Sequence, residues 1–320
     1  MDSPQGAALM YDVAIVGGGP AGLGAAIAAA TEGLDAVVLE ASRWGEQSAG
    51  SPLVENFPGF SHGISGGELA YIMHRQAKRL GVELRLEAVE VLWETVDVPG
   101  KLLRTRGLGG ADVVQARAVI LASGLHYRRL GDKGELPLHY LGTQDVDVKG
   151  SCCLVVGAGN GAAQTAIDLA QHADKVFLLS RGPNIALSMS AYLVDRVLEH
   201  DRIHILTNAE LVATDSFCAT VRCSEYGEIC IPCSDGFVFI GAEPASDWLD
   251  GLVEKDMAGY VVGKLANTKG GLALPYGTTG AGLFIAGDLR AGSMKRIVVA
   301  AAEGTQCVPL VMNYLHLENA

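Results

Sequence analysis

Residues 14–26 read AIVGGGPAGLGAA, a short apolar run that meets spaced glycines and continues into small residues. Gly17 allows a tight turn out of a strand, Gly19 lets the backbone approach a pyrophosphate, and Gly22 lets a helix pack close to that strand. Glu40 follows Gly22 by 18 residues, a spacing that puts a carboxylate within reach of a ribose diol. The stretch predicts a strand–turn–helix unit that binds a dinucleotide, with the pyrophosphate on the free N–H groups that begin the helix. The alternative is a glycine-rich turn without a ligand.

The composition indicates a well-packed globular chain with room for two domains. Of its 320 residues, 49% are hydrophobic and 19% are charged. The formal charge of −12 argues against non-specific nucleic-acid binding, because such binding needs a basic surface. No run of 18 apolar residues is present, and the start MDSPQGAALMYD lacks the basic flank of a signal peptide. We therefore expect a cytoplasmic protein with no nucleic-acid or membrane partner.

The opening pattern returns about 140 residues later, which predicts a second nucleotide-binding unit. Residues 152–156 read CCLVV, and GAGNGA follows at 157–162 with Ala162 in the place of the third glycine. The next strand, 175–179, is followed by Ser180 and Arg181 instead of an acid. An arginine there suits the 2′-phosphate of NADP better than a bare ribose, although a surface arginine is the alternative. The candidate contacts of this unit are Gly157, Gly159, Asn160, Ala162, Ser180 and Arg181.

Apolar periodicity predicts the remaining elements. Helices are expected over 68–80, 163–173, 189–200 and 297–315, and strands over 82–91, 101–106, 203–206, 210–215, 235–241 and 282–288. Residues 113–124 are expected to form a strand followed by a turn of small residues. Residues 125–150 are expected to be an irregular linker, because they carry glycines, a proline and mixed charge. Residues 219–233 resemble a hairpin around Tyr226 and Gly227, which would put Cys223 opposite Cys230.

Taken together, these motifs resemble the low-molecular-weight thioredoxin reductase family of flavoproteins over nearly the whole chain. The marks are the two glycine turns with Glu40, ENFPG at 55–59, ASG at 122–124, DGFVFIGAEP at 235–244, and GD at 287–288 followed by Lys295 and Arg296. The resemblance implies an α/β fold of two Rossmann-like dinucleotide-binding domains, the second inserted into the first. It implies an FAD domain from 1–124 and 242–320, an NADPH-type domain at 125–241, and a homodimer.

The resemblance also implies a set of flavin contacts. They are Gly17, Gly19, Pro20, Ala21, Gly22, Glu40, Gln47, Asn56, Val89, Ala122, Gly124, Gly287, Asp288, Arg296 and Ile297, the last two at the polar edge of the ring, where the family more often has Gln in place of Ile. Glu40 would hold the ribose, and the backbone of Val89 would meet the adenine. Gln47 and Asn56 match positions beside the ring, and Asp288 matches the acid that bonds the ribityl or pyrophosphate side. Taken alone, Asn56 and Asp288 also fit turn chemistry.

The chain departs from the family at the redox cysteines. The family carries a CxxC motif shortly before the second glycine turn, and aligning back from Gly157 puts Tyr140 and Thr143 at the cysteine positions. Residues 139–149 contain no cysteine. The usual disulfide relay between flavin and thioredoxin is therefore missing from this position.

The arginine-rich stretch that grips NADPH in the family is also thinned. Gly182 and Pro183 follow Arg181, and Arg196 lies further on. Related families take electrons from ferredoxin, and one diflavin-linked branch holds a second flavin in place of the pyridine nucleotide. The second site is therefore expected to hold NADP(H) or a second FAD.

The seven cysteines are expected to be reduced, buried or redox-active rather than a disulfide framework. Cys230 and Cys233 have CxxC spacing and are the candidate catalytic pair, with Cys223 as a competing partner for Cys230. On a strand, residues three apart point to opposite faces, so the pairing needs a bend at Pro232. The alternative is ordinary buried cysteine, as expected for Cys152, Cys153 and Cys307. No spacing of His, Cys and Asp indicates a metal site.

These features favour an FAD-dependent oxidoreductase of the disulfide reductase type. The flavin would exchange electrons with a dithiol, and the small partner protein would be thioredoxin or ferredoxin. One alternative is a ferredoxin- or flavodoxin-NADP reductase of the same fold, which needs no cysteine pair and would dock an acidic partner at Arg128 and Arg129. Another is a non-catalytic redox sensor that retains FAD.

Overall fold

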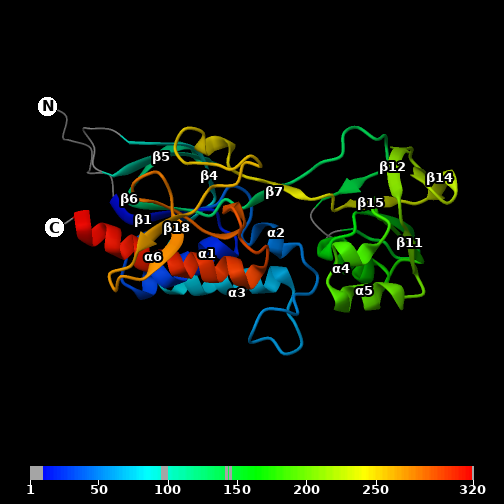
Figure 1. Ribbon diagram of the computed structural model, residues 1–320, viewed down its shortest axis with the longest axis horizontal. Coiled ribbons are helices and arrows are strands. Elements are labelled where there is room, and N and C mark those ends of the chain that lie inside the picture. Colours follow the sequence, from blue (N-terminus) through cyan, green and yellow to red (C-terminus); the bar gives the residue numbers. More distant parts are fainter. Residues whose placement is uncertain (1–9, 95–99, 141–142, 144–145, 319–320) are drawn as a thin grey trace.

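A computed structural model describes residues 10–94, 100–140, 143 and 146–318, which form two lobes joined by a narrow waist (Figure 1). The first nine residues, on which the expectation about a signal peptide depends, lie outside this description, as do four residues of the segment 139–149. Two β-strands form the link between the lobes, β7 (Leu125–Tyr127) and β16 (Ala242–Pro244), which pair antiparallel. The chain therefore leaves the first lobe and returns to it along the same ribbon.

The first lobe is built on a nine-stranded sheet with the order β17-β18-β19-β6-β1-β2-β3, to which β5 and β4 are added. Its strands are β1 (Met10–Val16), β2 (Ala36–Leu39), β3 (Glu83–Arg85), β4 (Glu87–Trp93), β5 (Lys101–Gly107), β6 (Gly110–Leu121), β17 (Lys264–Asn267), β18 (Ala273–Gly277) and β19 (Leu283–Ile285). The central strands are parallel, with Val13 opposite Ala36 and Ala118. Because parallel strands end at the same edge, the segments after β1, β2, β6 and β19 meet there.

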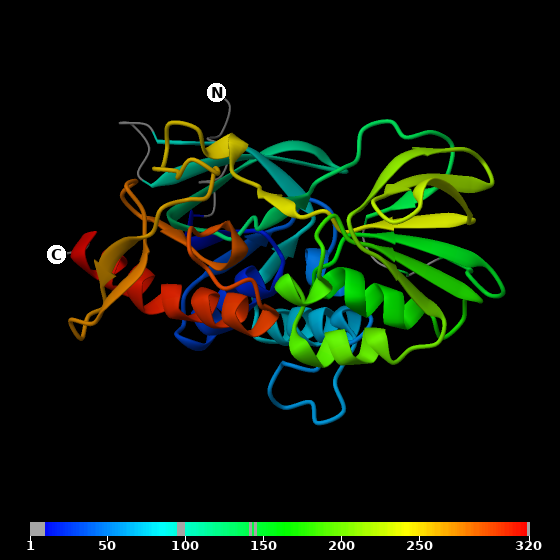
Figure 2. The same cartoon turned by 45° about the vertical axis from the view of Figure 1, so that its right-hand side comes forward.

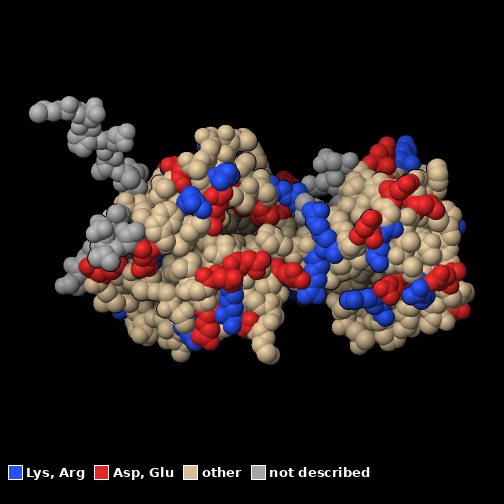
Figure 3. All heavy atoms as spheres, turned by 90° about the horizontal axis from the view of Figure 1, so that it is seen from above, with Lys and Arg blue, Asp and Glu red and all other residues tan. Residues whose placement is uncertain are grey.

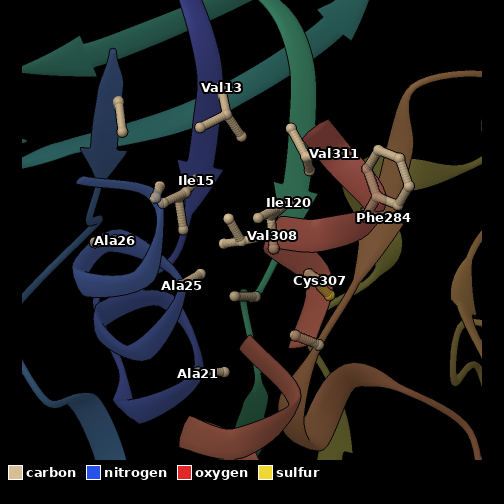
Figure 4. Packing of buried hydrophobic residues seen from close by; sticks show 14 of the residues in the cluster. Val13, Ile15, Ala21, Ala25, Ala26, Ile120, Phe284, Cys307, Val308 and Val311 are labelled. Carbon is tan, nitrogen blue, oxygen red and sulfur yellow. The ribbon is translucent and has the colours of Figure 1, made fainter. Parts of the chain in front are cut away.

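Two helices with small residues cover one face of this sheet, α1 (Pro20–Thr31) and α6 (Ile297–Glu318). A Cβ on Gly24 would lie 2.5 Å from the carbonyl oxygen of Ala301, and one on Gly304 would lie 1.9 Å from that of Ala21. The two helix backbones therefore touch, which explains why the segment after the first turn is rich in Gly and Ala. Figure 4 shows Ala21 and Ala25 of α1 and Cys307 and Val308 of α6 in this core.

Further helices lie beside this pair, the short α2 (Glu46–Ala49) and α3 (Gly66–Arg79). Ser65 caps α3 by accepting a hydrogen bond from the backbone N–H of Glu68 at 3.1 Å, and Lys78 and Arg79 stand in the last turn. The expected helix over 68–80 therefore begins two residues earlier, at Gly66. Short 3₁₀ turns complete the lobe, η2 (Asp247–Leu249) and η3 (Gly287–Leu289).

The second lobe has a five-stranded parallel sheet with the order β11-β10-β9-β15-β8. Its elements are β8 (Leu138–His139), β9 (Cys152–Val156), α4 (Asn160–Leu169), β10 (Lys175–Leu179), η1 (Ile185–Leu187), α5 (Ala191–Leu198), β11 (Ile203–Leu206) and β15 (Asp235–Val238). A three-stranded sheet adds β12 (Ala209–Thr214), β13 (Cys218–Cys223) and β14 (Gly227–Pro232). Figure 2 shows the strands fanned out on one side of this lobe and α4 and α5 on the other.

Two expectations about this lobe are wrong. The segment 125–150 is not wholly irregular, because it contains β7 and β8. The hairpin turns at 224–226, with Gly227 at a φ of +72°, so Cys223 pairs with Gly227 while Cys230 pairs with Thr220. The sequence offers glycine as a turn residue, but here Gly227 closes the loop as the first residue of the returning strand. The α/β fold with two parallel-sheet nucleotide-type units is as predicted.

Candidate functional site

A cavity of about 280 Å³ opens at the edge of the first sheet where β1, β6 and β19 end. It is lined by many of the predicted flavin contacts: Gly19, Pro20, Ala21, Gln47, Ala122, Gly124, Asp288, Arg296 and Ile297. A second cavity of about 170 Å³ is lined by Gly17, Glu40 and Val89. The two cavities share Glu46, Ser123 and Leu125 in their walls. Together they form one elongated site along the first glycine turn.

The first glycine turn has the backbone that its sequence predicts. Gly17 has a φ of +113°, and a Cβ there would lie 2.2 Å from the carbonyl oxygen of Ala122. A Cβ on Gly22 would lie 1.8 Å from the carbonyl oxygen of Gly17, so Gly22 has a packing role and lines neither cavity. At Gly19 the nearest atom to such a Cβ is 3.9 Å away, which leaves open space beside the start of α1. An anion can therefore approach the helix N-terminus over Gly19.

Glu40 is buried at the end of β2 and ties the turn to this strand. Its Oε2 accepts a hydrogen bond from the backbone N–H of Gly18 at 2.6 Å, and its Oε1 accepts one from Ser42 at 2.8 Å. Burial, assisted by the neighbouring Glu46, raises the pKa of Glu40 to about 8. The Glu40 carboxyl group therefore supports the turn as well as lining the second cavity.

Asp288 in η3 supplies an unsatisfied acceptor. Among the described residues, its buried Oδ1 has no hydrogen-bond partner. Burial raises the pKa of Asp288 to about 6, and Lys295 opposes the shift. The Lys295 ammonium donates a hydrogen bond to the backbone oxygen of Asp288 at 2.5 Å, so it does not satisfy the carboxylate. A buried acceptor on a cavity wall fits a ligand that brings a hydroxyl donor, as the ribityl chain of FAD does.

A buried ion pair that the sequence does not signal holds η3 in place. Glu303 of α6 accepts hydrogen bonds from the backbone N–H of Gly287 at 2.8 Å and the hydroxyl of Ser293 at 2.9 Å. Its partner is the Arg290 guanidinium, at 2.5 Å. Gly287 itself has a φ of +74° and packs against Ala21 rather than lining a cavity. The available signal for Glu303 was an acid that follows the small apolar run VVAAA at 298–302.

The second lobe also reaches the main cavity. Gln164 of α4 lines it, donates a hydrogen bond from Nε2 to the carbonyl oxygen of Leu53 at 3.2 Å, and accepts one from Ser51 at 3.4 Å. Arg196 of α5 forms an ion pair with Glu55 at 2.9 Å. Contacts between lobes depend on the fold as a whole, so the local sequence pattern around Gln164 does not reveal them.

Asn56 is the one predicted ring contact that the structure does not bring to the site. It is exposed on the loop between α2 and α3, which projects below the body in Figure 1, and it lines neither cavity. Its neighbour Glu55 is instead held by Arg196 of the other lobe.

The second glycine turn repeats the backbone of the first but not its surroundings. Gly157 has a φ of +131°, and a Cβ there would lie 2.2 Å from the carbonyl oxygen of Phe239. The side chain of Asn160 accepts a hydrogen bond from the backbone N–H of Ser190 at 2.7 Å. The hydroxyl of Ser188 donates to the carbonyl oxygen of Ala158, also at 2.7 Å. Residues 188–190 thus bridge this turn.

The strand end beside the second turn carries the two remaining predicted contacts. Ser180 is buried, and its hydroxyl donates a hydrogen bond to the carbonyl oxygen of Gly182 at 3.1 Å. Arg181 is exposed. Ala162 is buried under the turn, while Gly159 faces open space as Gly19 does. Arg181 is therefore a charged group available to a phosphate near this turn.

The candidate catalytic pair is not formed. Cys230 is bonded to Cys218, with their Cα atoms 6.0 Å apart, and Cys233 is a free thiol. The strand alternation explains this, because Cys230 faces solvent whereas Cys233 is buried on the other side, where burial raises its pKa to about 12. Neither residue of the predicted pair lines the main cavity. As expected, Cys153 and Cys307 are buried in the cores.

The positions where the family carries cysteines have other partners. The hydroxyl of Tyr140 accepts a hydrogen bond from the backbone N–H of Leu130 at 3.3 Å, and the hydroxyl of Thr143 donates one to Asp168 at 2.5 Å. In the described segments, no three His, Cys, Asp or Glu side chains converge in a way that holds a metal ion. No helix of the described chain has the length and apolar character needed to cross a membrane.

Basic side chains gather at the waist between the lobes, next to a hollow in the first lobe (Figure 3). Arg128 and Arg129, the predicted docking residues, directly follow β7 of the connecting ribbon. Arg128 forms an ion pair with Glu243 at 3.1 Å, and the Arg129 guanidinium lies 5.1 Å from the ring centre of Tyr140. The Arg128 charge is thus partly offset by its partner.

Known proteins share this chain's architecture. The family model described as pyridine nucleotide-disulphide oxidoreductase matches residues 11–304. A thioredoxin reductase of Mycolicibacterium smegmatis is 33% identical over 311 residues, 92% of this chain and 93% of the relative. A bifunctional thioredoxin reductase/thioredoxin of Mycobacterium leprae is also 33% identical, but this chain spans only 65% of it. The crystal structure of T. acidophilum thioredoxin reductase superimposes with a TM-score of 0.83 at 26% identity, covering 95% of this chain and 99% of that one.

Proposed function

This chain belongs to the pyridine nucleotide-disulphide oxidoreductase family, and we propose that the site at its first glycine turn holds FAD for electron exchange with a dithiol or disulfide. The chain is a flavin-dependent oxidoreductase of the disulfide reductase type. Its resemblance to low-molecular-weight thioredoxin reductases covers almost its full length.

The observation that carries the assignment of FAD is the pairing of an open helix N-terminus with a buried, unsatisfied acid in one cavity. Gly19 leaves space for a pyrophosphate at the start of α1, and no side-chain cap within the described chain takes its place. Asp288 offers an acceptor that needs a donor. A dinucleotide with a polyhydroxyl chain supplies both the anion and the donor.

FAD, when bound, supplies the redox chemistry. The residues of the chain position it: the α1 N-terminus would hold the pyrophosphate, Glu40 would keep the turn in shape beside the ribose, and Asp288 would accept a hydroxyl hydrogen bond. Arg296 and Ile297 line the same cavity at the start of α6. Gln164 of the other lobe also lines this cavity.

We propose that residues 1–124 and 242–320 form the FAD domain and that 125–241 form the second nucleotide-binding domain. This division agrees with the strands of the two large sheets. Gly157, Gly159, Asn160 and Ala162 would meet the pyrophosphate of NADP(H), with Ser180 and Arg181 near its 2′-phosphate. A second FAD is the alternative, since the arginine set is thin.

The partners are proposed by comparison with the relatives. Thioredoxin is the proposed small redox partner, since the two relatives named above are thioredoxin reductases. Ferredoxin is the alternative electron donor. We further propose a homodimer in the cytoplasm, as the resemblance implies.

The test is cofactor identity and stoichiometry. The purified protein is denatured, and the released flavin is identified and counted per chain. We expect about one FAD per chain, and bleaching of the bound flavin by NADPH. A count of about two flavins per chain would indicate that the second site holds a second FAD instead of NADP(H). A flavin-free protein that fails to bind added FAD would contradict the proposal. Asp288→Asn is the matched variant, because it keeps the shape of the side chain but makes it a weaker hydrogen-bond acceptor.

A second function is favoured by the cysteine positions. Of the seven cysteines, all within the described residues, none lines the main cavity. A ferredoxin- or flavodoxin-NADP reductase of this fold needs only an exposed flavin and a basic docking surface, and basic side chains gather at the waist. A variant with every cysteine replaced by Ser separates the two functions. Undiminished NADPH-to-ferredoxin electron transfer would favour the second function, and loss of disulfide reduction alone would favour the first.

A further inference from the structure

The outer face of the hairpin β13–β14 carries a disulfide that no step above uses. Cys218 and Cys230 lie diagonally across the two strands, 12 residues apart in sequence. Side chains alternate along both strands, so the neighbouring Ala219, Val221 and Ile231 are buried below the sheet. Cys230 is exposed and Cys218 is half-buried. The sulfur atoms therefore lie on the solvent side of the sheet.

The hairpin does not depend on this bond. β13 and β14 are paired without interruption from Cys218 opposite Pro232 to Cys223 opposite Gly227. The inner face of the sheet packs into a hydrophobic cluster that includes Leu154 of β9. Backbone hydrogen bonds and this buried face hold the strands together on their own. Opening the disulfide therefore leaves the fold intact, as a reversible exchange requires.

The residues around the disulfide act in opposite directions on attack by an external thiolate. Asp215 Oδ2 lies 3.6 Å from the sulfur of Cys218, and its negative charge disfavours release of Cys218 as a thiolate. Phe217, the preceding residue, is 82% exposed and offers an apolar contact beside the bond. Asp215 Oδ1 accepts hydrogen bonds from the backbone N–H groups of Phe217 and Cys218, both at 2.8 Å, and thereby fixes this turn.

We propose that the Cys218–Cys230 disulfide is a thiol–disulfide exchange site for the dithiol of a small redox protein. A thiolate of the partner attacks the exposed Cys230 sulfur, the Cys218–Cys230 bond breaks, and Cys218 leaves and takes up a proton. The second thiol of the partner then attacks the mixed disulfide and releases Cys230 as a thiolate, which also takes up a proton. The partner becomes a disulfide, and two electrons and two protons reach this chain.

The second thiol must come from the partner, because attack by the freed Cys218 would only restore the original disulfide and no other cysteine of the chain is suitably placed. Cys223 and Cys233 are the free cysteines nearest in sequence, and both are buried on the opposite face of the hairpin. Burial also raises the pKa of Cys233 to about 12, so it is a thiol at neutral pH. A partner with a single thiol would therefore stop at the mixed disulfide.

The experiment follows the exchange in the purified holoprotein with no electron donor for the flavin. Because the flavin takes no part in this measurement, a failure of the exchange is distinct from a failure of the proposed flavin function. Alkylation under denaturing conditions should label five of the seven cysteines, leaving Cys218 and Cys230 linked. After treatment with a reduced thioredoxin, both should become labelled. A thioredoxin whose resolving cysteine is replaced by Ser should be trapped on the peptide that contains Cys230. A disulfide that thioredoxin leaves intact, or trapping on another cysteine, would overturn the proposal.

Two variants test the surroundings of the bond. Phe217→Ser should slow reduction by thioredoxin several-fold and leave reduction by dithiothreitol unchanged, because only a protein makes the apolar contact. Tyr226→Ser is the matched control, since Tyr226 is 59% exposed in the loop of the same hairpin. Asp215→Asn should accelerate both reductions, because the leaving Cys218 thiolate no longer faces a negative charge. An equal loss of rate in Tyr226→Ser, or none in Phe217→Ser, would contradict this exchange face.

Discussion

The two glycine turns of this chain have nearly the same backbone. The N–H of Gly17 donates to the carbonyl oxygen of Leu39 at 2.8 Å, and that of Gly157 donates to Leu179 at 2.9 Å. Both glycines have positive φ, and a Cβ on either would collide with a carbonyl oxygen 2.2 Å away. The helices that follow begin alike, at Pro20 and Asn160.

Their surroundings differ. The first turn borders a cavity in which Asp288 presents an unsatisfied oxygen, and it is supported by the buried Glu40 and Glu303. At the second turn, Ser188 and Ser190 already bond to residues of the turn. The glycine spacing therefore specifies a backbone path, whereas the ligand is decided by the side chains that other strand ends and helices bring to it.

The largest expected effect tests the support of the first turn. Glu303→Ala leaves Arg290 and the N–H of Gly287 without their buried acceptor, so the free energy of unfolding should fall by about 3–5 kcal/mol, with loss of bound FAD. Urea denaturation and flavin content measure the two effects. Glu318→Gln is the control, since that carboxylate lies 3.6 Å from Arg117 at the surface. A change below about 1 kcal/mol in Glu303→Ala would contradict this role.

The next effect comes from Asp288, for which the second turn has no counterpart. Its pKa in the folded protein, about 6, lies above its ordinary value. Below about pH 4 the carboxyl is protonated whether folded or unfolded and causes no penalty. Between about pH 4 and pH 6 the unfolded chain ionises this carboxyl while the folded protein keeps it protonated, so the flavin-free protein should lose up to about 3 kcal/mol of stability over this range. In denaturation curves measured over this pH range, Asp288→Asn should remove the pH-dependent loss of stability. A loss that is unchanged in the variant would have to come from another group.

A smaller effect separates ligand binding from folding. Gly19→Ala adds a methyl group into the open space beside the start of α1, so stability should hardly change. The methyl group should obstruct the pyrophosphate and weaken FAD at least tenfold, about 1.4 kcal/mol. Gly159→Ala is the matched change at the second turn and should leave FAD binding as it was. Equal losses in the two variants would remove the distinction between the turns.

The smallest effect concerns the bridge over the second turn. Ser188→Ala removes the hydrogen bond to the carbonyl oxygen of Ala158, which should cost about 0.5–1 kcal/mol of stability. If residues 188–190 limit access to this turn, the same change should lower the KM for NADPH severalfold. Steady-state kinetics checks this, with Ser216→Ala as a control in the same lobe. A higher KM would indicate that the bridge assists the nucleotide.

The sequence predicts features that are encoded locally. The strands Cys152–Val156, Lys175–Leu179 and Ile203–Leu206 lie where apolar runs and turn residues place them. The predicted hairpin register differs from the observed one by three residues. The sequence leaves this open because the turn can form either at Tyr226 and Gly227 or at the residues before them. That register decides which cysteine is near Cys230, so the predicted pair fails with it. Gln164 and Glu303 act through contacts distant in sequence, which no local pattern contains.

The packing of α6 against α1 determines the order in which the two lobes can be completed during synthesis. The wall of the proposed flavin site at Asp288 and Ile297 follows the second lobe in the sequence, as does the helix whose Gly304 touches Ala21. During synthesis, residues 138–238 leave the ribosome before β19 and α6 exist, so the second lobe has all its strands while the first lacks a central one. The first lobe therefore starts before the second and is completed after it, so FAD binding awaits the synthesis of β19 and α6.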